Sequence, residues 1–230
     1  LQPEVGNNLN LGFIVDRRGL CGLMRVQWET NFYYMMMKNM IRLFPADTRS
    51  IYTNLGKTRT IGMDTDVKVD VTRNVYLYFN LTLQDIRDRQ RWFNDEQGTS
   101  NPTYNKHVPN IPAFYYNYGM EYHAEGLIGH RELSRVYIDV SHVGEFDWGW
   151  QMSSLAEERR KWRIPSNDVF TIGLQQSLWH NNMSLSLELE NVFNKENYME
   201  FKMPLPGRTL KAKLRFNLFR DKLAGGAMSL

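Results

Sequence analysis

The chain has 230 residues, a formal net charge of +3 and 23% charged residues, so it is neither a disordered segment nor a basic arm for nucleic acid. Its single cysteine excludes an intrachain disulfide framework and a cysteine-based metal site. Aromatic residues make up 13%, which favours a large core, a binding surface or a membrane interface. The opening LQPEVGNNLN has no initiator methionine, and we expect a mature or cut product.

Apolar and polar residues alternate with a period of two along nine stretches, as strands require and helices do not. In 23–32, for example, Met24, Val26 and Trp28 share one side while Arg25 and Gln27 share the other. Most stretches approach the roughly 9 to 11 residues with which a tilted strand crosses a bilayer. The pattern predicts an all-β fold of about nine antiparallel strands, with at most a short helix in 153–162. The nine stretches are 7–15, 23–32, 58–71, 75–84, 113–123, 134–141, 169–178, 183–190 and 208–219.

The connections between these stretches alternate strictly between short and long. Short turns are expected at 16–19, 71–74, 125–132 and 179–182, and long links at 38–57, 87–110, 144–167 and 194–207. Outer-membrane barrels follow this rule, with short periplasmic turns and long extracellular loops, and a soluble sandwich has no reason to do so. The sequence therefore predicts transmembrane β-barrel strands, the last of which runs inward to the periplasm.

One face of the predicted strands is too polar for a packed core. Charged residues recur on it from Arg25 to Arg215, and burying them without water would be costly. We expect this face to line a lumen and the other face, with Leu210, Leu214 and Phe216, to meet lipid. A surface sheet with one solvated face is the alternative that this pattern leaves open.

Three segments resemble the C-terminal part of the TonB-dependent outer-membrane receptors. They are YTNLGKTRTIGMDTDV (52–67), NKHVPNIPAFYYNYGMEY (105–122) and LELENVFNKENYMEFKMPLPGRTLKAKLRFNLF (187–219). In that family an Asn-hydrophobic-Phe step, here Asn191 to Phe193, leads to a loop closing in Pro-Gly-Arg, here Pro206 to Arg208, and then to the terminal strand. The opening PEVGNNLNLGF is also similar to a barrel strand of these receptors.

The resemblance implies a 22-stranded barrel plugged by an N-terminal domain, in the outer membrane of a Gram-negative bacterium. Such receptors take up a scarce ligand, an iron-siderophore, heme, cobalamin or a glycan, with energy passed through TonB. Residues 1–219 would be the C-terminal portion of the barrel and 220–230 a C-terminal tail. The implied partners are outer-membrane lipid, the missing N-terminal barrel and plug portion on the same or a separate chain, TonB through that portion, and a small-molecule ligand, but no nucleic acid.

The sequence carries no catalytic motif, so no enzyme, cofactor or metal site is expected. The long links hold the best candidates for ligand binding, because Arg and Trp can hold an anionic or aromatic ligand by charge and stacking. The candidates are Arg87, Arg89, Arg91, Trp92, Tyr104, His107, Trp148, Trp150, Arg159, Arg160 and Trp162.

Other interpretations of the same residues stay open. The aromatic residues are also typical of an interfacial belt, with the Arg residues meeting anionic lipid headgroups outside. A different class of function is an outer-membrane adhesin or assembly component that binds a protein through these loops. A small barrel enzyme is a third class, which the scattered acidic and His residues do not favour.

Overall fold

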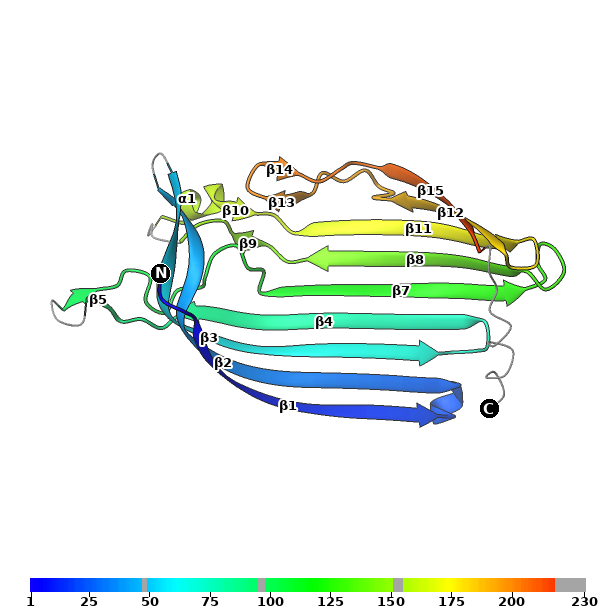
Figure 1. Cartoon of the computed structure of the whole chain (residues 1–230), viewed down its shortest axis with the longest axis horizontal. Coiled ribbons are helices and arrows are strands. Elements are labelled where there is room, and N and C mark those ends of the chain that lie inside the picture. Colours follow the sequence, from blue (N-terminus) through cyan, green and yellow to red (C-terminus); the bar gives the residue numbers. More distant parts are fainter. Residues whose placement is uncertain (47–48, 95–97, 151–154, 218–230) are drawn as a thin grey trace.

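The computed structural model describes residues 1–46, 49–94, 98–150 and 155–217, and its centre is one antiparallel sheet of nine strands. Each strand pairs with its predecessor and its successor among the nine, so the sheet is a simple meander (Figure 1). The nine predicted strands are confirmed. Their order in the sheet is β1 (Val5–Arg18), β2 (Arg25–Ala46), β3 (Arg49–Asp70), β4 (Val75–Asp88), β7 (Phe114–Glu125), β8 (Leu133–Val143), β11 (Asn167–Leu178), β12 (Met183–Glu190) and β15 (Thr209–Phe216).

The hairpin of β2 and β3 corrects one expectation about the links. Residues 38–57 were expected to form a long polar link, but backbone pairing continues from Lys38–Lys57 to Ala46–Arg49, and each strand has 22 residues. Asn39 lies within β2 with a φ of 58°, so the side-chain alternation is broken there although the pairing resumes beyond it. The break in alternation explains why the pattern failed to predict the outer half of this hairpin.

The other three long links carry small elements of their own and lie at one end of the sheet (Figure 1). The predicted short helix is confirmed as α1 (Ala156–Lys161). No helix among the described residues is long and apolar enough to cross a membrane. The 3-10 turn η1 (Leu20–Gly22) lies instead in the short turn between β1 and β2. The further small elements of the long links are β5 (Trp92–Asn94), β6 (Thr99–Ser100), β9 (Phe146–Asp147), β10 (Arg163–Ile164), β13 (Tyr198–Glu200) and β14 (Met203–Pro204).

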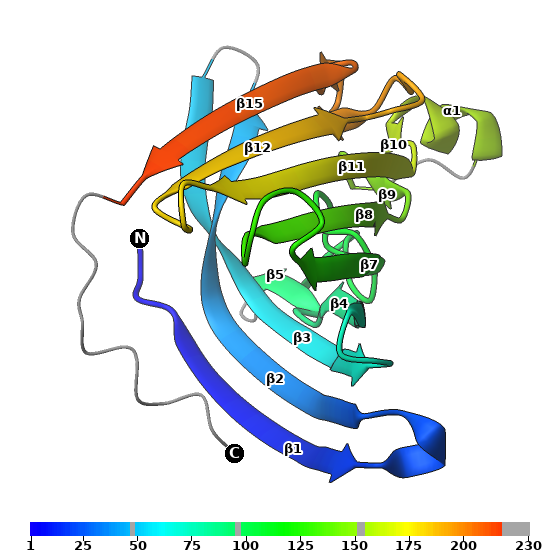
Figure 2. The same cartoon turned by 90° about the vertical axis from the view of Figure 1, so that its right-hand side faces the viewer.

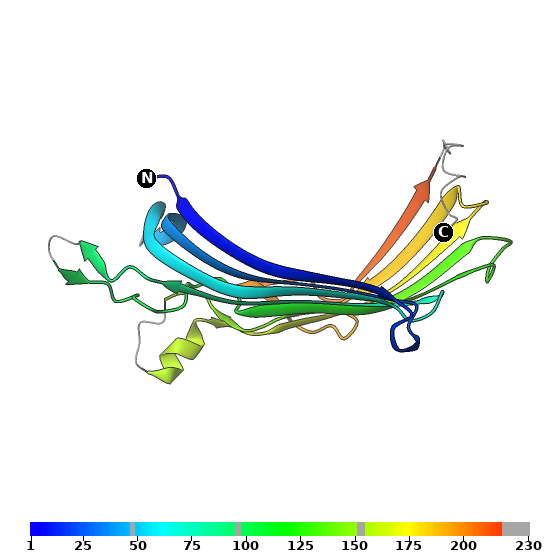
Figure 3. The same ribbon diagram turned by 90° about the horizontal axis from the view of Figure 1, so that it is seen from below.

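The sheet is a curved trough rather than a closed cylinder (Figures 2 and 3). Its two edges are β1 and β15, which do not pair with each other in the described chain. An edge strand presents unpaired backbone N–H and C=O groups, and a barrel removes such edges by closure. The arrangement is therefore a section of a barrel wall. The predicted tail 220–230 lies outside the described residues.

On the polar face, side chains form hydrogen bonds that link non-adjacent strands. Tyr78 on β4 lies over Gly119 on β7, and its hydroxyl donates a hydrogen bond to Asp139 on β8 (2.7 Å). In the same way Tyr137 on β8 lies over Gly173 on β11 and donates to Glu188 on β12 (2.5 Å). Only glycine leaves room for a ring lying flat on the next strand, so these positions explain two of the strand glycines.

The apolar face has no such partners. In the described chain the buried hydrophobic residues are only Val108, Ala124, Val140 and Ile164. On β15, by contrast, Leu210 is 71% exposed and Leu214 and Phe216 are each 54% exposed. A contiguous exposed apolar surface of this extent marks a face that meets lipid or another protein.

Candidate functional site

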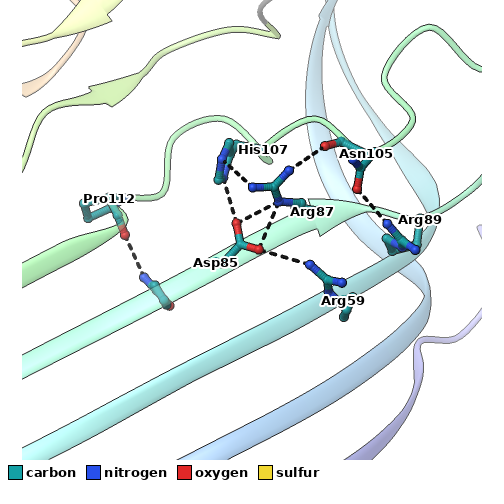
Figure 4. A network of polar contacts seen from close by, with 8 residues as sticks. Arg59, Asp85, Arg87, Arg89, Asn105, His107 and Pro112 are labelled. Carbon is teal, nitrogen blue, oxygen red and sulfur yellow. Dashed lines mark hydrogen bonds and ion pairs between the residues drawn. The ribbon is translucent and has the colours of Figure 1, made fainter.

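The first group of sequence-predicted residues surrounds the loop end of β4 (Figure 4). Asp85 accepts hydrogen bonds from Arg87 (2.9 Å) and Arg59 (3.1 Å) and lies 3.2 Å from the His107 ring nitrogen. Arg87 also approaches His107 (3.3 Å). Two of the four residues, Arg87 and His107, were predicted from the sequence. Arg59 and Asp85 were missed, although their alternation with Ile61 and Leu83 placed them on one side of neighbouring strands.

The link after β4 is ordered by one buried carboxylate. Asp88 is 2% exposed and accepts hydrogen bonds from the Asn101 side chain (2.8 Å) and from the Gln90 backbone N–H (2.8 Å). Asn101 is itself 7% exposed and also reaches the Gln90 carbonyl (2.8 Å). A buried carboxylate whose acceptors are satisfied fixes the link against the strand end and so positions the cationic residues that follow.

Four of the predicted cation and ring residues in this link form two stacked pairs. The Arg89 guanidinium lies 5.5 Å from the Tyr104 ring centroid and donates a hydrogen bond to Asn105 (2.6 Å). Arg91 lies 5.3 Å from the Trp92 ring. Stacking of this kind holds the planar guanidinium while leaving its N–H groups available at the ring edge.

The second group lies in the links that follow β8 and β12. Trp148 stacks on Trp162 with ring centroids 5.4 Å apart, and Phe201 lies 5.1 Å from Trp148 and 5.2 Å from Trp162. Sequence reasoning found both tryptophans but missed Phe201, because the residue belongs to a different link. Trp150 makes no ring contact with a described residue, and Arg160 is exposed on α1, so the structure does not bring them into this stack.

A pocket of about 260 Å³ adjoins the aromatic stack. Two cations stand at it: Arg163, which pairs with Glu145 (2.9 Å) and Asp147 (3.3 Å), and Lys202, whose ammonium lies 5.2 Å from the Phe201 ring. An apolar wall with cations at its rim suits a planar or anionic ligand. The lining residues are Arg163, Ile164, Pro165, Tyr198, Phe201 and Lys202.

Arg159, also predicted from the sequence, lies one turn from Trp162 on the same link. The backbone N–H of Trp162 donates to its carbonyl (3.3 Å). The link after β4 is joined to the link after β8 by a hydrogen bond from the Asn110 backbone N–H to the Asp147 carbonyl (2.8 Å). Among the described residues no group of three or more His, Cys, Asp and Glu side chains is arranged to hold a metal ion.

The Asn-hydrophobic-Phe and Pro-Gly-Arg steps form one folded corner between β12 and β15. Asn191 is 4% exposed, has a φ of 49°, donates to the Lys195 carbonyl (2.8 Å) and accepts from the Lys195 N–H (2.9 Å). The Arg208 N–H donates to Asn194 (2.8 Å), where a Cβ on Gly207 would also lie only 2.8 Å away. These residues therefore shape the link, and the structure gives them no separate chemical role.

A second charged group marks the loop end of β11, beyond the apolar residues of that strand. Asp168 pairs with Lys195 and with His142 (2.5 Å). The hydrogen bond from Lys195, and after it the one from His142, lowers the pKa of the Asp168 carboxyl below its usual value of 3.8. The His142 ring is in turn stacked 4.6 Å from the Tyr116 ring.

A curved nine-stranded meander with unpaired edges and folded links at one end defines the wall of an antiparallel β-barrel. Solved structures of transporters and receptors share this fold. The match to "Copper transporter OprC" has 18% identity and a TM-score of 0.65, and covers 94% of this chain and 31% of that chain. The match to the ferric-catecholate import receptor Fiu from K12 E. coli has 15% identity and a TM-score of 0.62, covering 93% and 27%.

BauA, the ferric preacinetobactin receptor from Acinetobacter baumannii, matches with 12% identity and a TM-score of 0.64 over 91% of this chain and 29% of its own. No curated protein matches the sequence. The family model described as TonB dependent receptor-like, beta-barrel, matches residues 1–192, and the chain belongs to this family. The chain spans about 30% of the length of each of these solved receptors. Members of the family are receptors and transporters rather than enzymes.

Proposed function

We propose that this chain is the C-terminal portion of the barrel wall of a receptor in the outer membrane of a Gram-negative bacterium. The receptor imports a scarce ligand with energy passed through TonB. The observation that carries the proposal is the combination of family membership with an exposed apolar face around the whole nine-stranded sheet. Such a face is stable only against lipid or a partner, and the opposite polar face suits a water-filled or plugged lumen.

The proposal includes partners that complete the barrel. The edges β1 and β15 need strands to pair with, and these would come from the missing N-terminal barrel portion, on the same or a separate chain. The plug that precedes that portion would contact TonB. The cargo belongs to the class of metal ions and metal chelates, for which the printed names of the similar structures, a copper transporter and two ferric receptors, are the support.

Uptake by cells expressing the whole receptor tests the function. The probes are labelled copper ions, a ferric catecholate, heme and cobalamin, each offered with TonB intact and with TonB deleted. We expect uptake of at least one probe that stops when TonB is deleted, because the plug opens only with that energy. Uptake that persists without TonB would contradict an energised receptor and favour a passive pore.

The residues of the links after β8 and β12 are proposed to bind this cargo, and the aromatic stack of Trp148, Trp162 and Phe201 is the part to test first. Replacing Trp148 with Ala removes one of three rings that contact one another, and loss of one stacking partner is worth about 0.5 to 1.5 kcal/mol. We expect the affinity of the whole receptor for its cargo to fall about 2- to 12-fold in a titration of the purified protein.

Trp179→Ala is the matched control for this substitution. Trp179 is 68% exposed in the short turn after β11, at the opposite end of the sheet from the links. It should leave cargo affinity unchanged. An equal loss in both variants would contradict a site in the loops and would point to a general effect of tryptophan removal on the barrel.

A further inference from the structure

Three neighbouring strands change from apolar to charged residues near the loop end of the apolar face. The register pairs Ile61 on β3 with Asp85 on β4, and two residues further toward the loops it pairs Arg59 with Arg87. Because side chains alternate between faces, these residues stand on the same face as the exposed apolar side chains, not on the polar face. Figure 4 shows the charged side chains gathered on one side of these strands.

The next level carries cations on β2 and β3, and Arg89 lies beside them directly after the end of β4. Lys38 on β2 and Lys57 on β3 are direct partners in the register, and the Arg89 N–H donates to the Lys57 carbonyl (2.7 Å). Like charges directly opposite one another destabilise a sheet unless an anion lies between them. We call the set Lys38, Lys57, Arg59, Arg87, Arg89 and Arg91 the cationic patch.

The described residues supply little negative charge to this patch. At the lower level Asp85 pairs with both Arg59 and Arg87, so a single carboxylate faces two guanidinium groups. At the upper level neither Lys38 nor Lys57 forms an ion pair with a described residue. A pocket of about 290 Å³ opens there, and it has no carboxylate among its lining residues Lys38, Asn39, Gly56, Lys57, Arg89, Gln90, Arg91 and Trp92.

We propose that the cationic patch binds the phosphate groups of a lipid of the outer leaflet. Arg and Lys bind phosphate oxygens by charge-assisted hydrogen bonds, and the acyl chains of the same molecule would lie on the apolar residues directly below the patch, such as Ile61 and Leu83. The continuity of cationic and apolar surface on one face selects an amphiphile over a free anion. The inference rests on the proposed location in the outer membrane.

The test is a titration of the purified whole receptor in detergent with fluorescent, doubly phosphorylated lipid A. The double variant Lys38→Gln, Lys57→Gln removes two exposed cations that have no described acidic partner, so folding should be preserved and is checked by thermal unfolding. Each cation at a lipid surface is worth about a five-fold change in affinity, so we expect the lipid to bind about 30-fold more weakly. Dephosphorylated lipid A should bind wild type and variant equally.

The matched control is Lys68→Gln, Lys211→Gln, which removes the same charge from the polar face. Retained affinity in the Lys38, Lys57 variant, or an equal loss in the control, would overturn the proposal. Displacement of the lipid by inorganic pyrophosphate at equal concentration would also overturn it, since the site would then be one for soluble anions. The titration uses no TonB, so its failure is distinct from a failure of TonB-dependent uptake.

Discussion

The two faces of this sheet differ in where their side chains find partners. On the polar face, charged and hydroxyl groups find partners on neighbouring strands, as Tyr78 does with Asp139 and Arg25 with Asp16 (2.6 Å). On the apolar face, ion pairs gather toward the loop ends of the strands, around Asp85 and Asp168. The polar face is therefore stabilised from within the chain, and the apolar face depends on what covers it.

This difference predicts which substitutions lower the stability of the barrel on each face. A new charge on the polar face meets water and other polar groups, but the same charge on the apolar face must be buried against lipid or a partner. A new methyl group destabilises the polar face more than the apolar face. On the polar face tyrosine rings lie closely over glycines, whereas the apolar side chains point outward into open space.

The largest expected effect is that of a charge on the apolar face. Ile138 on β8 is 40% exposed and stands between Met120 and Ile172 in the register. Ile138→Arg should lower the free energy of unfolding of the whole, refolded receptor by about 2 to 4 kcal/mol, measured by urea titration in lipid vesicles.

The control for this prediction lies on the same strand. Ser141 faces Asn117 and Val169 in the register and belongs to the polar face. Ser141→Arg should change the free energy by less than about 1 kcal/mol. If the arginine at 141 were the more damaging of the two, the assignment of the faces would be inverted.

A smaller effect is expected from crowding the polar face. A Cβ at Gly119 would lie 2.4 Å from Asp139 Oδ1, 2.5 Å from the Tyr78 ring and 2.8 Å from the Ile138 carbonyl oxygen. The carbonyl cannot move without disturbing the sheet, so Gly119→Ala should destabilise the receptor by about 1 to 3 kcal/mol in the same urea titration.

Two further variants separate the causes of that loss. Gly149→Ala, with nothing within 4 Å of its Cβ, should be nearly neutral. Tyr78→Phe keeps the ring and removes only the hydroxyl bonded to Asp139, at a cost of about 1 kcal/mol. A neutral Gly119→Ala would show that the tyrosine does not lie on this glycine.

The alternation of residue types was sufficient to predict the nine strands and their two faces. It works because a strand turns successive side chains to opposite sides, and each face here keeps one chemical character over the central part of the strands. It failed where the rule is locally broken, at Asn39, whose positive φ interrupts the pattern in a strand that then continues to Ala46.

The candidate site was predictable only in part, since its contacts join separate links. Composition identified Trp148 and Trp162, but nothing in the sequence near them indicates that Phe201 completes the stack. The buried Asp88 likewise looks like any loop carboxylate until Asn101 is folded onto it. Local patterns predict strands, whereas the pairing of distant links depends on how the whole sheet brings its ends together.

The smallest expected effect concerns the charges at the loop end of the apolar face. Because Lys195 and His142 lower the pKa of Asp168 in the folded state, its carboxylate contributes stability above pH 3.8 that is lost as the pH falls through the lowered value. The contribution at this partly exposed site is about 1 kcal/mol or less.

The stability difference between wild type and Asp168→Asn, measured by urea titration, should therefore shrink as the solution is acidified. In a Lys195→Gln background the same difference should already be smaller at neutral pH. A difference that stays constant with pH would mean that the ion pair does not form, and that the charges beyond the apolar belt act on the surrounding lipid rather than on each other.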